Sequence, residues 1–135
     1  MARISLGVAL ALVALVLMAC APAAGQQAIV YLAAPQEIIG TLIQITPTIA
    51  TPTGYDFLSV ELVTEHSVTF VASATAGWQI VSALGGTTMQ PLRVTISVFE
   101  QAAASSVAIS VTPVSERRVM VERIMGELDR RFRQG

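Results

Sequence analysis

Four segments of the chain alternate between apolar and polar residues with a period of two, the pattern of β-strands that bury one face. They cover residues 56–64, 67–73, 92–99 and 107–112. The apolar members of each segment share one side: Leu58, Val60, Leu62, Val68, Phe70, Ala72, Val94, Ile96, Val98, Val107, Ile109 and Val111. Only Glu65 and His66 separate the first two segments, the spacing of a tight hairpin. We therefore expect an antiparallel sheet of two hairpins with one apolar face.

Two amphipathic segments are expected to cover that apolar face. The first, residues 35–46, places Pro35 at the first helical position and Glu37 in the first turn, where a negative charge favours the helix dipole. The second begins at a Ser115 cap and runs to about Arg133. At 100° per residue, one arc of this helix collects most of its apolar side chains, and only Arg117 intrudes on it. The arc consists of Val114, Val121, Ile124, Met125, Leu128 and Phe132.

The remaining segments complete a two-layer α+β domain in the order β-α-β-β-(short element)-β-β-α. Residues 28–34 are rich in β-formers and predict a short first strand, and residues 76–86 predict a short helix or a covering loop. This order resembles the TBP-like and helix-grip folds. The stretch "VYLAAPQEIIGTLIQI" is similar to the opening strand and helix of lipid-binding helix-grip proteins. The resemblance implies the fold and no particular activity.

The first nineteen residues have the organisation of a secretory signal peptide. Arg3 and the amino terminus supply a short positive region, and residues 4–18 are uncharged and apolar. This apolar run is shorter than the roughly 20 residues that a transmembrane helix needs. A cleaved signal peptide is therefore favoured over a retained transmembrane anchor helix.

The only cysteine of the chain, Cys20, follows Leu17, Met18 and Ala19. This segment resembles the lipobox of bacterial lipoproteins, which implies a diacylglycerol thioether on Cys20, cleavage before it and acylation, for example with palmitate, of the new amino group. The predicted organisation is a signal peptide over 1–19, a lipidated tether over 20–27 and one α+β domain over 28–135. Because Ala21 is not aspartate, the resemblance favours an outer membrane, on its periplasmic side, where one exists. The alternative is an ordinary secretory signal cut after Ala24 or Gly25, with Cys20 discarded.

The amino-acid composition argues against nucleic-acid binding, metal binding and catalysis. The chain has no lysine and a net charge of −1, whereas nucleic-acid binding requires basic patches, so we expect no nucleic-acid partner. One cysteine allows no internal disulfide, and one histidine, His66, gives no convergent ligand set for a metal and no base for a serine nucleophile. We therefore expect no cofactor, no metal and no catalytic residues.

These observations favour a membrane-anchored envelope lipoprotein that acts as a non-enzymatic binding or structural module. Its partners would be membrane lipid, through the acyl chains, and an envelope protein. The alternative is a carrier or sensor of an apolar small molecule held between the sheet and the C-terminal helix. Arg117 and Trp78 are the candidate ligand contacts, although we expect Trp78 to lie in or at the edge of the core. We expect that core to be filled.

Overall fold

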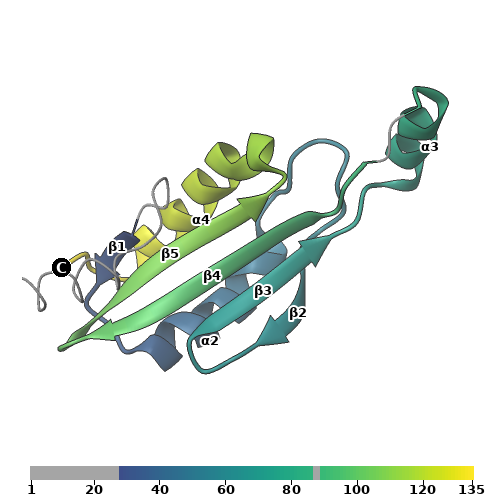
Figure 1. Cartoon of the computed structure of the whole chain (residues 1–135). Coiled ribbons are helices and arrows are strands. Elements are labelled where there is room, and N and C mark those ends of the chain that lie inside the picture. Colours follow the sequence, from purple (N-terminus) through teal and green to yellow (C-terminus); the bar gives the residue numbers. More distant parts are fainter. Residues whose placement is uncertain (1–27, 87–88) are drawn as a thin grey trace, which may run out of the picture.

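The computed structural model describes residues 28–86 and 89–135, so Cys20, the predicted signal peptide and the tether lie outside the described residues. Five strands form one antiparallel sheet in the order β1-β5-β4-β3-β2 (Figure 1). Their bounds are Ala28–Tyr31 for β1, Ser59–Val63 for β2, Ser67–Ala72 for β3, Leu92–Gln101 for β4 and Ala104–Thr112 for β5. The sheet thus joins the two predicted hairpins side by side and adds β1 beside the second.

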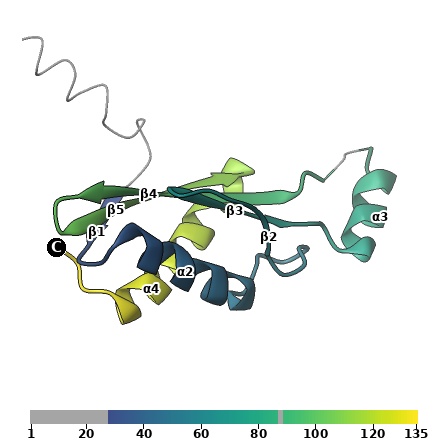
Figure 2. The ribbon, with the colours of Figure 1, turned by 90° about the horizontal axis from the view of Figure 1, so that it is seen from below.

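Two helices cover one face of the sheet, and a third stands apart from it. Helices α2 (Pro35–Ile45) and α4 (Arg117–Arg131) lie on the same side, as Figure 2 shows. Helix α3 (Ala76–Leu84) connects β3 to β4 and projects beyond the end of the sheet. Short 3-10 turns follow α2 at Thr46–Thr48 and precede α4 at Val114–Glu116. The chain therefore has the predicted two-layer α+β fold.

The core lies between the sheet and the two covering helices. Strand register aligns the inward side chains in rows, so that Phe70 pairs with Val94 and Val94 with Val111. The next row places Val68, Ile96 and Ile109 side by side. Helix side chains cover these rows, and the fully buried ones are Ile38 and Leu42 of α2 with Met120, Ile124 and Leu128 of α4. Burial of these aliphatic side chains removes the largest apolar area from water and is the main source of stability.

The two edges of the sheet differ. At one edge the chain after α4 returns beside β1, where the Leu32 amide donates to the Arg133 carbonyl at 2.7 Å and the Gly135 amide donates to the Val30 carbonyl at 3.0 Å. A bridge between Tyr31 and Gln134 lies between these two bonds. At the other edge β2 pairs only with β3 among the described residues. One edge is therefore covered and the other is open.

Strand β2 departs from the predicted burial. All five of its residues are exposed, and Val60 and Leu62, expected in the core, are 41% and 57% exposed. A register shift between these two residues makes Val60 pair with Phe70 but Leu62 with Thr69. A bulge of this kind turns the following side chain to the other face. In addition, the main contacts of α2 are with β3 and β4 and those of α4 are with β5, away from this edge.

The last helix also differs from its prediction at both ends. Ser115 does not cap it, because residues Val114–Glu116 form a 3-10 turn and the side chain of the capping residue, Glu116, makes no cap hydrogen bond. Val114 consequently lies outside the buried arc and is 74% exposed. The helix ends at Arg131, since the residues that follow extend along β1. The central residues of the arc, Ile124, Met125 and Leu128, are buried as predicted.

Candidate binding surface

The two candidate ligand contacts lie on different elements. Arg117 is the first residue of α4 and is partly buried. Trp78 belongs to α3 and is 41% exposed. The loop between α2 and β2 separates these two residues. Gly54 of this loop contacts the Trp78 indole, and the neighbouring Tyr55 interacts electrostatically with Glu116, which precedes Arg117. The structure therefore does not combine Arg117 and Trp78 into one pocket beneath α4.

Trp78 is not part of the core, contrary to expectation. A Cβ atom at Gly54 would overlap the indole ring, which shows that the ring lies directly on the glycine backbone. Gly54 also has a φ of +98°, a conformation that side chains other than hydrogen disfavour. Close approach of the indole and the unusual backbone both require glycine here. Trp78 is 41% exposed, so part of the residue remains available to solvent or to a partner.

The base of α3 is fixed to the domain by hydrogen bonds. The Thr75 amide donates to the Gly54 carbonyl at 2.9 Å, and the Gln79 side-chain amide donates to the Ala74 carbonyl at 2.7 Å. The Asp56 amide donates to the Ser73 carbonyl at 2.9 Å, beside a bridge between Tyr55 and Ala74. The Tyr55 hydroxyl reaches the Gln90 carbonyl at 3.3 Å, on the return segment. The arm that carries α3, formed by residues 73–75 before the helix and 89–91 after it, is therefore attached at its base on both sides.

Helix α3 presents its apolar face to solvent. None of its nine residues is buried, and its large side chains are Trp78, Ile80, Val81 and Leu84, which are 41%, 63%, 56% and 85% exposed. At 100° per residue these four occupy an arc of about 160° on one side of the helix. The smaller or polar residues Gln79, Ser82 and Ala83 occupy the opposite side, and the Gln79 side chain bonds to the base of the arm. A surface helix normally has the reverse orientation.

An open pocket of about 620 Å³ lies between α3 and the strands that carry it. Its lining is uncharged and consists of Ser73, Ala74, Gln79, Ala83, Gly86, Met89 and Pro91. Its volume is within the range of small-molecule sites, but such sites orient their ligands with several convergent polar groups. Gln79 supplies the only side-chain amide in this lining, and its nitrogen is already bonded to Ala74. The pocket thus offers apolar contacts but few polar groups that could orient a ligand.

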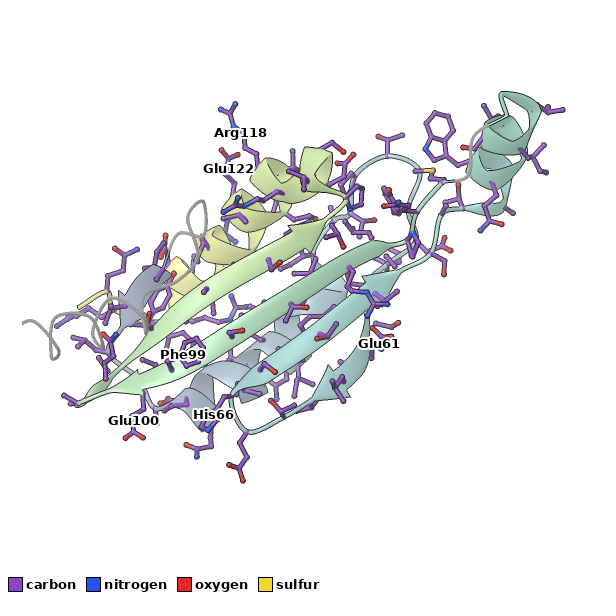
Figure 3. The ribbon with its side chains drawn as sticks, in the orientation of Figure 1. Glu61, His66, Phe99, Glu100, Arg118 and Glu122 are labelled. Carbon is purple, nitrogen blue, oxygen red and sulfur yellow. The ribbon has the colours of Figure 1, made fainter. Side chains whose placement is uncertain are left out.

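Most charged side chains of the described residues lie on or beside α4, and the others are distributed over α2, the sheet and the loops. His66 is exposed at the β2–β3 turn, and Glu61 of β2 forms an ion pair with Arg93 at 2.8 Å (Figure 3). Arg118 and Glu122 form another on the outer side of α4, at 3.4 Å. Within residues 28–86 and 89–135, no three His, Cys, Asp or Glu side chains converge in a way that would hold a metal ion. Over the same ranges, no helix is both long and apolar enough to cross a bilayer.

One buried tyrosine has a strongly perturbed environment. The Tyr31 hydroxyl donates to Asp129 Oδ1 at 2.8 Å and lies 3.4 Å from the Met125 sulfur. Burial, and then the hydrogen bond and negative charge of Asp129, raise the pKa of Tyr31 well above its ordinary value. The phenol therefore stays protonated and links β1 to α4. This group supports the fold.

Comparison with known proteins gives no relative from which to assign a function. No protein-family model, no curated protein and no solved structure matches the chain. Conclusions about this protein therefore rest on its own residues.

Proposed function

We propose that the chain is an exported lipoprotein, anchored to a membrane by acylated Cys20, whose folded domain is a non-enzymatic binding module. The observation that carries the binding role is the outward apolar face of α3, because four large apolar side chains exposed together on one helix mark an interaction site. The lipobox-like segment Leu17–Cys20 supports the anchor. Two or three acyl chains, at ~0.8 kcal/mol per buried methylene, hold a protein stably in a bilayer.

The positions of the titratable side chains support the non-enzymatic part of the proposal. General acid–base or nucleophilic catalysis needs titratable side chains within hydrogen-bond reach of one another in a cleft. The described pocket has an uncharged lining, and His66 lies at the exposed β2–β3 turn. The proposed location is the periplasmic side of an outer membrane, where the cell has one.

The alternative, a carrier of an apolar molecule between the sheet and α4, has weaker support. Met120, Ile124 and Leu128 of α4 are fully buried where such a ligand would lie. Arg117, the candidate partner of a carboxylate head group, lies at the end of the helix and is only partly buried. The pocket described above is lined by residues of α3 and its flanking segments and by none of α4.

Intact mass spectrometry of the protein extracted from membranes tests the anchor. The expected species begins at Cys20 and carries a diacylglycerol group, with or without an amide-linked acyl chain. The Cys20→Ser variant should remain an uncleaved precursor, because the lipoprotein peptidase acts only after the thioether has formed. An unmodified soluble protein that begins at Gln26 would contradict the proposal.

A further inference from the structure

The apolar face of α3 lies in a long uncharged segment. Between Glu65 and Arg93 the sequence contains no aspartate, glutamate, lysine or arginine. This segment includes β3, α3 and both sides of the arm that carries α3. Figures 1 and 2 show that α3 is the part of the described structure that projects farthest beyond the end of the sheet. The projecting end is therefore both apolar and free of charge.

The size of this surface argues against a second copy of the chain as its occupant. A stable protein dimer buries about 800 Å² on each partner, from roughly 20–30 residues. Helix α3 has nine residues, of which four carry large apolar side chains outward. A contact between two α3 helices would be far below that requirement.

The absence of charge argues against a polypeptide partner. Protein interfaces surround their apolar centre with a polar rim, in which charges select the partner and steer its approach. The segment between Glu65 and Arg93 supplies no charged side chain for such a rim, and Asp56, whose amide bonds to Ser73, lies at the base of the arm. Hydrocarbon, in contrast, requires apolar side chains without charge and a backbone whose polar groups are bonded internally.

Helix α3 has apolar, uncharged side chains and an internally bonded helical backbone between its two ends. Its first turn is bonded through the Gln79 amide to the Thr75 carbonyl at 2.9 Å, and its last turn through the Gly85 amide to the Val81 carbonyl at 3.1 Å. Trp78 lies near its beginning, and tryptophan is the residue enriched at the boundary between lipid head groups and hydrocarbon. We propose that α3 inserts its apolar face, formed by Trp78, Ile80, Val81 and Leu84, into the surface of a lipid bilayer. This inference extends the proposed binding module by naming its partner.

The proposed insertion has a characteristic lipid dependence. Basic amphipathic helices bind anionic membranes partly through charge, and salt weakens that part of the binding. An uncharged arm has no such contribution, so α3 should insert equally well into zwitterionic and anionic vesicles at low and high salt.

Fluorescence of Trp78 measures insertion directly, because Trp78 is the only tryptophan of the chain. The protein purified from membranes is reconstituted into phosphatidylcholine vesicles, with or without brominated phosphatidylcholine. The emission is expected to shift to shorter wavelength, to be quenched by the brominated lipid and to be protected from aqueous iodide. The double variant Ile80→Asp and Leu84→Asp should lose the shift, the quenching and the protection, although its core is intact because neither residue is buried.

Leu62→Asp is the matched control, since Leu62 is also exposed and apolar but belongs to β2. This variant should behave like the unmodified sequence, and circular dichroism confirms the folding of both variants. Trp78 emission that stays accessible to iodide and insensitive to brominated lipid, in a protein shown to be acylated, would overturn the insertion and leave the anchor intact. Quenching of Trp78 in a protein without acyl chains would support the insertion and refute the anchor. Loss of quenching in Leu62→Asp as well would refute the assignment to α3.

Discussion

The hydrogen bond between Tyr31 and Asp129 is expected to contribute measurably to stability, and Tyr31→Phe removes it with little other change. The tyrosine ring is fully buried and packs edge to face on Phe132, with ring centroids 6.3 Å apart. Phenylalanine keeps this packing and loses only the hydroxyl, which donates to Asp129 at 2.8 Å. The substitution therefore isolates the contacts of the hydroxyl with α4, the bond to Asp129 and the weaker contact with the Met125 sulfur.

The magnitude follows from the surroundings of Asp129. Hydrogen bonds to charged groups contribute about 1.5–3 kcal/mol to stability. The Asp129 carboxylate is exposed and also accepts a bond from the Gln134 side-chain amide at 2.8 Å, so it is rehydrated when the phenol hydroxyl is lost. We expect Tyr31→Phe to lower the free energy of unfolding by about 1–2 kcal/mol, measured as a lower urea midpoint with an unchanged slope. A loss below about 0.5 kcal/mol, the usual range of surface substitutions, would refute the reasoning.

The stability difference between the original protein and Tyr31→Phe is expected to change at alkaline pH. Because the pKa of Tyr31 is raised in the folded protein, the unfolded chain loses the phenol proton first, near pH 10. Below that pH both states hold the proton, and above it the stability falls as pH rises, by at most about 1.4 kcal/mol per pH unit from this one group. Nearby solvent at Asp129 screens its charge, which limits how far the pKa is raised and therefore the total loss of stability. The stability difference between the original protein and Tyr31→Phe should therefore narrow above pH 10, and a constant difference from pH 8 to 11 would contradict the raised pKa.

Two further substitution pairs test the packing of α4 and the contact beneath Trp78. Leu128→Ala should lower the unfolding free energy by about 2–5 kcal/mol, because Leu128 is fully buried, whereas Arg130→Ala on the exposed side should change it by less than about 0.5 kcal/mol. Equal urea midpoints for these two variants would show that α4 is not packed on the sheet. Gly54→Ala should destabilise the fold by at least about 1 kcal/mol and displace Trp78, which would alter the fluorescence. Gly40→Ala in α2 should instead stabilise the fold by about 0.5–1 kcal/mol, because a Cβ at Gly40 meets no atom within 4 Å. Similar effects at the two glycines would refute the contact with the indole.

The hydrophobic pattern of the sequence correctly predicted the strands and helices that pack in the core. Val68, Phe70, Val94 and Ile96 alternate as central strands do, and each is fully buried. Pro35 and Glu37 mark the start of α2 correctly. The pattern was wrong for Val60 and Leu62 because alternation does not reveal which strand lies at an edge, nor where a bulge reverses the side chains. The start of α4 was wrong for a related reason, since a possible cap residue does not exclude a 3-10 turn before the helix.

The candidate binding surface was only partly predictable. Trp78 was a candidate contact, but Ile80, Val81 and Leu84 were not recognised as part of the same surface. The missing signal was present in the sequence, because these residues share one helical arc within a segment that lacks charge from position 66 to 92. An amphipathic pattern indicates that a face needs covering and does not say whether this chain or another body covers it. The spacing of these residues therefore predicts that α3 has an apolar face. Only the fold shows that this face points away from the core.

The unequal edges of the sheet limit how copies of this protein can associate through their strands. Exposed edge strands are the usual starting points of fibrils, because each added strand leaves a new edge for the next. Here β2 is open, whereas at the far side Tyr31 is bridged to Gln134. Two copies that pair β2 with β2 would bury the open edge of each and leave a covered edge at both ends. Strand pairing between native copies would thus stop at two molecules, and growth into a fibril would first require residues 133–135 to detach from β1.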